Sequence, residues 1–296
     1  MKNLVLVDGN SLMFRVYYAT INTNNIIKNK KGVYTNALLG FINILEKIIA
    51  KSKDYIFIAF DAHHLTKRHE IYADYKKGRP KTPLSLISQI PLIKQYLELS
   101  GIKYYEQNGY EADDIIGTLA KKASKKNIKV EIFSSDKDLL QLVDDNITVC
   151  LMKKGISQVE YYNPTSLFSK YGLNECQMID FKSMVGDNSD NIKGVLGIGP
   201  KTATKLLQKF SNLENIFSSL NIIKPTIKNK LILFKEKVFF NRLLLTIDLS
   251  VPLPFNLLDT KIKDIDFKEL ITFYKEMELE ILIFKLQKKY IRDNII

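Results

Sequence analysis

The chain has 296 residues, enough for one large or two moderate domains, and 46% of them are apolar. Its 44 basic and 32 acidic residues leave a net charge of +12, which suits a polyanionic partner or a lysine-rich composition that only aids solubility. The apolar run at 4–7 is too short for a signal peptide or a membrane span, so we expect a cytoplasmic protein with no membrane partner. The two cysteines, Cys150 and Cys176, lack metal-ligand spacing, and we expect both to be reduced thiols.

Acidic residues follow the predicted strands of the first half. Each strand is a short, continuous apolar run, as in a parallel sheet that is buried on both faces. The runs and their acids are 3–8 with Asp8, 55–61 with Asp61, and 130–133 with Asp136 and Asp138. Since parallel strands end at the same edge of a sheet, we expect these acids to converge there.

A predicted helix over 111–126 begins with three carboxylates within four positions, Glu111, Asp113 and Asp114. A helix dipole stabilises one negative charge by about 0.3–1 kcal/mol, and three carboxylates in one turn also repel one another. Helical spacing is also present at 36–50 and at 84–100, where Pro91 interrupts it, and 102–105 is a short strand candidate. Strands that alternate with helices predict an α/β fold with a parallel sheet.

The pattern changes near residue 164, where short helical segments replace the strands. The run GDNSDN at 186–191 adds Asp187 and Asp190 to the acids. It is followed by GVLGIGPKTA at 194–203, which has the form of a helix-hairpin-helix. Such a hairpin binds phosphate through backbone amides at a helix start. Its candidate phosphate contacts are Gly197, Gly199, Lys201 and Thr202. The tail from 231 to 290 is predicted to be mostly helical.

Carboxylates packed this closely are stable mainly when divalent cations neutralise them. All-oxygen ligand sets suit Mg²⁺ or Mn²⁺, and two such ions about 4 Å apart can serve phosphodiester hydrolysis. The histidines His63, His64 and His69 lie in one loop and are expected to face solvent. The sequence therefore predicts a two-metal acidic site in a basic surface.

Basic and aromatic residues alternate at 67–81, between the second strand and the acidic helix. This mixture is typical of surfaces that bind single-stranded nucleic acid, although a solvated loop would also account for it. Arg68 and Tyr75 in this run, and Arg15 shortly after Asp8, are candidate DNA contacts.

Five motifs in order make the chain resemble the 5′-nuclease family of flap endonucleases and 5′–3′ exonucleases, in particular the N-terminal nuclease domain of bacterial DNA polymerase I. They are LVDGNSLMFR at 6–15, FDAHHLTKRHEIYADYKKGRP at 60–80, YEADDIIGTLA at 110–120, SSDKDLLQLV at 134–143 and MVGDNSDNIKGVLGIGPKTA at 184–203. The resemblance implies a resolvase-like (PIN-like) α/β nuclease domain at 1–164, with a helical arch at about 65–100. An all-helical domain carrying the helix-hairpin-helix would occupy 165–296.

The same resemblance implies the metal ligands. One ion would be held mainly by Asp8, Asp61, Glu111 and Asp113. The second would be held, directly or through water, by Asp136, Asp138, Asp187 and Asp190, with Asp114 assisting.

Roles toward DNA also come from the resemblance. Lys76 and Arg79 would steady the scissile phosphate at the base of the arch, and Tyr75 would stack on a base. A K⁺ ion at the hairpin would help to grip the duplex. The implied function is removal of 5′ flaps and RNA primers during replication and repair, by a monomer that works beside a separate DNA polymerase, near the nucleoid. The chain is then a free-standing nuclease or a fragment of a longer protein.

Two other functions remain open from the sequence. One is a PIN-type ribonuclease, which shares an acidic α/β core; the second domain and the hairpin argue against it. The other is a module that binds DNA junctions and has lost its chemistry. A complete acid set argues against this module, because concentrated negative charge does not help DNA binding.

Overall fold

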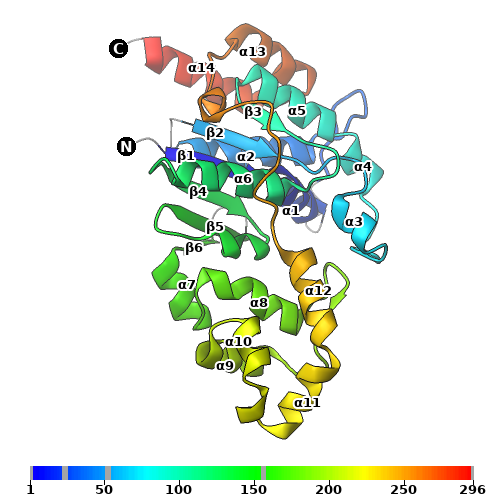
Figure 1. The fold of residues 1–296 in the computed structure, drawn as a ribbon. Coiled ribbons are helices and arrows are strands. Elements are labelled where there is room, and N and C mark those ends of the chain that lie inside the picture. The colour runs from blue at the N-terminus through cyan, green and yellow to red at the C-terminus, as the bar shows by residue number, and fades with distance from the viewer. Residues whose placement is uncertain (1–2, 22–25, 51–54, 155–157, 295–296) are drawn as a thin grey trace.

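A six-stranded sheet lies at the centre of the computed structural model, which describes residues 3–21, 26–50, 55–154 and 158–294 (Figure 1). The strand order is β3-β2-β1-β4-β5-β6, and all neighbours are parallel except β5 and β6. The strands are β1 (Asn3–Asp8), β2 (Tyr55–Ala59), β3 (Lys103–Tyr105), β4 (Lys129–Ser134), β5 (Ile147–Lys154) and β6 (Gln158–Tyr162).

The register of the sheet brings the predicted acids to one edge. Asp8 of β1 is level with Ala59 of β2, and Val7 is level with Phe133 of β4. Asp61 and Asp136 follow within three residues of these positions, so they leave the sheet at the same end as Asp8. This confirms the predicted convergence, which follows from the common direction of parallel strands.

Helices cover both faces of the sheet, because alternate residues of β1 and β2 point to opposite sides. Leu4 and Leu6 pack in one core with α6 (Ala112–Ser124), whereas Val5 and Val7 pack in another with the helices of the opposite face. Those helices are α1 (Gly9–Ile21), α2 (Asn36–Ile49), α4 (Leu84–Ile87) and α5 (Ile90–Leu99). The predicted helix 84–100 is therefore two helices, and Pro91 lies in the first turn of the second, where its missing amide costs no hydrogen bond.

The strands β5 and β6 were not among the elements predicted from the sequence. The antiparallel edge strand β6 has the sequence QVEYY and is only partly buried, so it lacks the continuous apolar run that identified the other strands. The short helix α3 (Lys67–Ile71) lies within the predicted arch, and a single 3₁₀ turn, η1 (Asp138–Leu142), follows β4.

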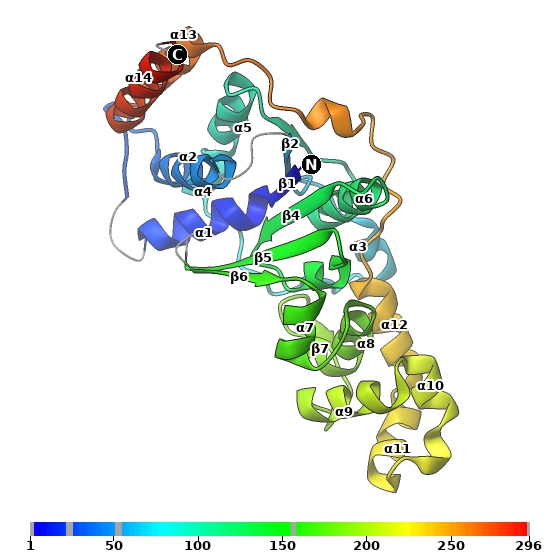
Figure 2. The same ribbon diagram turned by 90° about the vertical axis from the view of Figure 1, so that its left-hand side faces the viewer.

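Six helices form a second body beyond the β6 edge of the sheet (Figure 2). They are α7 (Pro164–Tyr171), α8 (Glu175–Val185), α9 (Pro200–Phe210), α10 (Leu213–Ser218), α11 (Pro225–Leu233) and α12 (Lys235–Leu245), with a 3₁₀ turn η2 (Leu220–Ile222) between α10 and α11. A two-stranded hairpin, β7 (Gly186–Asp187) with β8 (Ile192–Lys193), links α8 to α9. The predicted helix-hairpin-helix is thus formed by α8 and α9.

After α12 the chain returns to the α/β body. It runs through η3 (Leu257–Thr260) to α13 (Phe267–Glu276) and α14 (Glu280–Asn294), which pack in one core with α2 and α5 (Figure 1). Tyr274 of α13 stacks on Tyr96 of α5 at 6.4 Å between ring centroids. The predicted helical domain at 165–296 is therefore corrected: the segment after residue 246 packs with the first domain, because its apolar side chains join the cores on both faces of the sheet. In the described ranges, none of the helices is both long and apolar enough to span a membrane.

Candidate metal and nucleic-acid site

Asp8 lies at the centre of the acidic edge and is only 6% exposed. Its Oδ2 accepts a 2.7 Å hydrogen bond from the Ser134 hydroxyl, and its Oδ1 accepts a 2.9 Å bond from the Ser11 amide. The same Ser134 oxygen accepts a 3.0 Å bond from the Asp136 amide. One serine thus fixes the acids of two neighbouring strands. Sequence reasoning missed Ser134, although it lies directly before the acidic loop.

Asp61 is held against the start of the acidic helix. Its Oδ1 accepts a 2.8 Å bond from the Ala112 amide, and its own amide donates a 3.0 Å bond to Oδ1 of Asn10. Asn10 and Ser11 both come from the first turn of α1, so that turn organises the acids on either side. The GNS sequence at the start of α1 therefore binds both Asp8 and Asp61, the acids at the ends of β1 and β2.

Burial and mutual repulsion change the titration of three of these acids. Burial, followed by the charges of Asp61 and Asp136, raises the pKa of Asp8 to about 7. Burial and the surrounding carboxylates raise the pKa of Asp113 well above its ordinary value, and burial also raises the pKa of Asp136. Within the described residues no three acidic, histidine or cysteine side chains are already drawn together as a metal cage. An all-oxygen cluster that cannot hold its full negative charge nevertheless fits a hard divalent cation.

Four basic side chains, Lys76, Arg79, Lys182 and Arg68, pair with the remaining acids. Lys76 Nζ lies 2.5 Å from Oε1 of Glu111, and Arg79 Nη2 lies 2.5 Å from Oδ1 of Asp190. The third, Lys182, contacts two acids and is described next. Lys76 and Arg79 therefore contact acids of the cluster, and their role at a scissile phosphate stays a prediction.

Lys182 of α8 joins the acids of the two bodies. Its ammonium group forms ion pairs with Asp138 of η1 and with Asp187 of β7, the latter at 2.6 Å. Burial would raise the pKa of Asp187, but Lys182 and hydrogen bonds from Ser189 outweigh it and lower the pKa to about 2. Sequence reasoning missed Lys182. Its only signal is its position on the helix that leads into the second acidic loop.

Asp114 does not face the cluster, which corrects its predicted role as a metal ligand. Its Oδ2 accepts hydrogen bonds from Arg68 Nη1 at 2.8 Å and from the Glu111 amide at 3.0 Å. Its Oδ1 accepts bonds from Arg68 Nη2 at 2.7 Å and from the Asp248 amide at 2.8 Å. Both oxygens are therefore fully engaged by protein donors in a buried position.

Two of the predicted DNA contacts are buried among the acids instead. Arg68 is enclosed by its bonds to Asp114, and the Tyr75 side chain is 4% exposed. The Tyr75 hydroxyl lies 3.0 Å from Oδ2 of Asp190 and 3.2 Å from Oε2 of Glu111. In this arrangement the ring has no free face for a base, so its predicted stacking role is corrected to a bridge between two acids. Arg15 stays near the surface, where its Nε donates a 2.9 Å bond to Ser135.

The hairpin of the second body is held firmly on α8. The side-chain amide of Asn241 in α12 donates to the Ser183 carbonyl at 2.9 Å and to the Lys193 carbonyl at 3.0 Å. Gly197 has a φ of +78°, a conformation that favours glycine, and Gly199 is the extended residue before α9. Lys201 and Thr202 lie in the first turn of α9.

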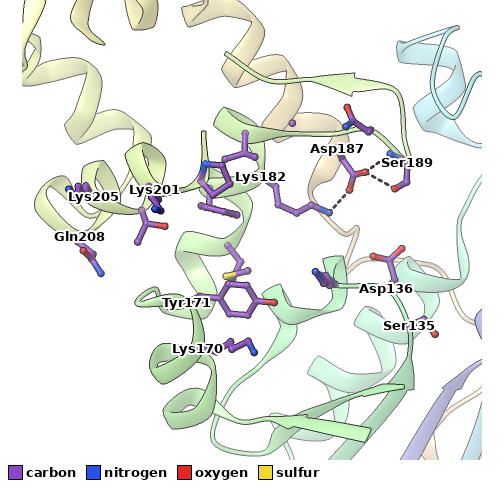
Figure 3. Close-up of a pocket in the computed structure, with 18 residues that line it drawn as sticks. Ser135, Asp136, Lys170, Tyr171, Lys182, Asp187, Ser189, Lys201, Lys205 and Gln208 are labelled. Atoms are coloured by element: carbon purple, nitrogen blue, oxygen red, sulfur yellow. Dashed lines mark hydrogen bonds and ion pairs between the residues drawn. The ribbon is translucent and has the colours of Figure 1, made fainter. Parts of the chain in front are cut away.

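A cleft of about 910 Å³ runs between the acidic edge and the start of α9 (Figure 3). Asp136 and Asp187 line one end of this cleft, and Lys201, Lys205 and Gln208 line the other. Lys170 of α7 also faces it. The sequence pattern did not single out Lys170, Lys205 or Gln208, because the second body, which carries them, meets the acidic edge only in the folded chain.

Comparison with known proteins identifies the family. Residues 3–172 match the model described as the 5′-3′ exonuclease, N-terminal resolvase-like domain. Residues 173–268 match the 5′-3′ exonuclease, C-terminal SAM fold. The chain belongs to the 5′–3′ exonuclease family. This confirms both the predicted family and the predicted fold of a resolvase-like domain followed by a helical one.

Relatives of this 5′–3′ exonuclease family member occur with and without further domains. A 5′-3′ exonuclease of Aquifex aeolicus is 37% identical over 97% of this chain and 96% of its own. DNA polymerase I of Bacillus subtilis is 42% identical over 96% of this chain. The chain spans only 32% of the length of that polymerase.

Solved structures share the fold of this family member at lower identity. A T5 D15 protein co-crystallized with metal ions superposes with a TM-score of 0.68 at 21% identity, over 84% of this chain and 90% of its own. The catalytic core of Rad2 in complex with a DNA substrate gives a TM-score of 0.57 at 16% identity, over 93% of this chain and 88% of its own.

Proposed function

We propose that this protein is a divalent-metal-dependent 5′–3′ exonuclease and 5′-flap endonuclease that hydrolyses phosphodiesters of DNA and of RNA primers in replication and repair. The observation that carries the proposal is the acidic edge, where burial and neighbouring carboxylates raise the pKa values of Asp8, Asp113 and Asp136, and which borders a lysine-lined cleft at Asp136. Family membership supports it, as do the names of relatives that are called exonucleases and the metal-bound and DNA-bound titles of structures with the same fold.

Two Mg²⁺ or Mn²⁺ ions are the proposed cofactors. The residues that would hold them are Asp8, Asp61, Glu111, Asp113, Asp136, Asp138, Asp187 and Asp190, and Asp114 is left out because its oxygens are already engaged. Bound there, divalent ions would activate water and stabilise the charge that develops on the scissile phosphate.

The basic side chains of the protein have a role separate from that of the metal ions. Lys76 and Arg79 extend from the base of the arch to the acids, and there they would bind the oxygens of the scissile phosphate. Lys182 holds Asp138 and Asp187 in one place, so that the acids of the two bodies face the same substrate. The chain thus positions a phosphate between its acids and these ammonium and guanidinium groups.

The cleft gives the substrate a path from the acids to the hairpin. Lys170, Lys201 and Lys205 would hold phosphates of the duplex without reading its sequence, and the backbone near Gly199 would approach a phosphate closely. A K⁺ ion at the hairpin is part of the proposal. We further propose a monomer that acts beside a DNA polymerase, near the bacterial nucleoid, since several relatives carry this segment in DNA polymerase I.

A 5′-flap duplex labelled at the flap end tests the proposal directly. Release of a flap-length product in Mg²⁺ but not in EDTA is expected, and Asp136→Ala should abolish it. Cleavage of single-stranded RNA in preference to flap DNA would favour the PIN-type ribonuclease. Tight binding of the flap with no cleavage in Mg²⁺ or Mn²⁺ would favour a module that only binds DNA junctions.

A further inference from the structure

We propose that Arg68 is a positioning residue for the acid cluster and not a contact for DNA. It holds the first turn of α6 against the segment 244–251, which connects α12 to the α/β body, and thereby fixes the carboxylate of Glu111 toward the other acids. This inference rests on the proposed function, because it assigns a role within the same site.

All five N–H groups of the Arg68 guanidinium find acceptors in the chain. Nη1 donates to Oδ2 of Asp114 at 2.8 Å and to Oε2 of Glu111 at 3.3 Å, and Nη2 donates to Oδ1 of Asp114 at 2.7 Å. The Leu244 and Thr246 carbonyls accept bonds from Nε at 2.8 Å and from Nη2 at 2.9 Å. With its side chain 12% exposed and every donor engaged, Arg68 has no donor left for a phosphate.

Its partner Asp114 also binds the backbone of two neighbouring segments, the start of α6 and the segment 244–251. The Asp114 carboxylate accepts the Glu111 amide, which fixes the first turn of α6, and the Asp248 amide, which fixes the connecting segment. The segment is held to α6 a second time, because the Thr118 hydroxyl lies 3.3 Å from the Asp248 carbonyl and accepts the Val251 amide at 3.2 Å. Arg68 therefore connects the arch, the acidic helix and the link between the two bodies.

Glu111 is the acid on which this arrangement acts. Its carboxylate lies between Arg68 at 3.3 Å and Lys76 at 2.5 Å, so its orientation is set by one cation on each side. If Arg68 is lost, the buried carboxylates of Glu111 and Asp114 have one cation fewer to balance their charge. The first turn of α6 also loses its connection to the segment 244–251. We expect the damage to appear in metal binding and turnover, since Glu111 is a proposed ligand.

Lysine cannot replace Arg68 in this role. The planar guanidinium fork matches a carboxylate with two parallel bonds and still reaches two carbonyls, whereas an ammonium group has three donors around one atom. The variant Arg68→Lys keeps the charge and so separates geometry from electrostatics. Outer partners of metal ligands typically change affinity or activity by 10- to 100-fold, and we expect a loss of about that size.

The test compares Arg68→Lys, Asp114→Asn and the double variant with the unaltered full chain. Mn²⁺ affinity is measured by calorimetry, flap-DNA affinity by fluorescence anisotropy in EDTA, and kcat and KM by flap cleavage. Arg68→Lys should weaken Mn²⁺ binding and lower kcat by about 10- to 100-fold and leave DNA affinity unchanged. The double variant should lose little more than either single variant, because both remove the same restraint.

Arg242→Lys is the matched control. Arg242 also pairs with two acids, Asp180 at 3.4 Å and Glu214 at 2.5 Å, but neither of these acids is a proposed metal ligand. It should lose thermal stability without losing Mn²⁺ affinity. If Arg68→Lys does not fold, Asp114→Asn is subject to the same expectation.

Three outcomes would reject either the positioning role of Arg68 or the proposed function of the protein. Weaker DNA binding with unchanged Mn²⁺ affinity would overturn the inference in favour of a DNA contact. Unchanged Mn²⁺ affinity and unchanged kcat in Arg68→Lys would also overturn it. A failure of the unaltered chain to cleave in Mg²⁺ or Mn²⁺ would instead reject the proposed function, while the Mn²⁺ affinities would still report on the role of Arg68.

Discussion

The Ser134 hydroxyl donates a 2.7 Å hydrogen bond to the buried Asp8 carboxylate and so links β4 to β1 at the acidic edge. This bond favours the ionised form of Asp8 and opposes the effect of burial on its pKa. The stability of the fold and the charge of the site therefore depend on the same hydroxyl.

Ser134→Ala should lower the stability of the fold and reduce the negative charge of the site at neutral pH. Loss of a donor to a buried carboxylate costs about 1–3 kcal/mol of unfolding free energy, and the pKa of Asp8 should rise, which weakens Mn²⁺ binding at neutral pH. Denaturant unfolding in EDTA and Mn²⁺ calorimetry measure the two effects. Ser124→Ala is the control, because Ser124 bonds to the Asp144 carboxylate far from the acids; it should lower stability alone. Equal Mn²⁺ affinity in both variants would contradict the prediction.

The stabilisation of the fold by a divalent cation should increase as pH rises. The folded-state pKa of Asp8, about 7, lies above its ordinary value of 3.8, so the folded protein binds more protons between these values. Without metal, the free energy of unfolding should therefore fall as pH rises from about 4 to 7, by at most about 1.4 kcal/mol for each step of one in pH. A cation replaces the proton, so the rise in Tm caused by Mg²⁺ should be larger at pH 8 than at pH 5.5. Thermal unfolding in EDTA and in Mg²⁺ checks this, and a Mg²⁺ effect independent of pH would contradict it.

Tyr75→Phe distinguishes a bridge between acids from a base-stacking ring. A ring that stacks on a base would work equally well as phenylalanine. In this structure the hydroxyl lies between Glu111 and Asp190, so its removal should lower both Tm in EDTA and the rate of flap cleavage. Cleavage rates from single-turnover assays, compared with those of Tyr18→Phe on the exposed side of α1, provide the measurement. A fully active and stable Tyr75→Phe would restore the stacking role.

Two glycines of the turn between β8 and α9 should respond differently to alanine. A Cβ on Gly194 would lie 2.3 Å from the Val185 carbonyl oxygen, a backbone atom that cannot move aside, so Gly194→Ala should lower Tm. Gly199 has extended backbone and open space around its Cβ position, so Gly199→Ala should fold normally. Its added methyl group should still weaken duplex binding if a phosphate approaches this backbone. Thermal unfolding and salt-dependent anisotropy measure the two effects, and equal loss of stability in both variants would contradict this prediction.

Much of the site could be predicted because single segments carry enough information. A buried parallel strand needs a continuous apolar run, and the acids directly after such runs must leave the sheet at one edge. Asp8, Asp61 and Asp136 were located in this way, and the turn chemistry of 194–203 was enough to place the hairpin before α9. These features depend on neighbouring residues in the chain.

The tertiary structure decided which charged groups face one another. Asp114 and Asp113 are adjacent in the sequence and both acidic, yet one is saturated by Arg68 and the other faces the cluster, because adjacent helical side chains point about 100° apart. Lys182, Lys170 and the returning α13 have their roles only through contacts with distant segments. The sequence by itself determined four of the six strands of the main sheet, the acids that follow them and the family. Only folding decided which acid has both oxygens engaged by protein donors, as Asp114 has, and which face the cluster, since these partners come from elements far apart in the chain.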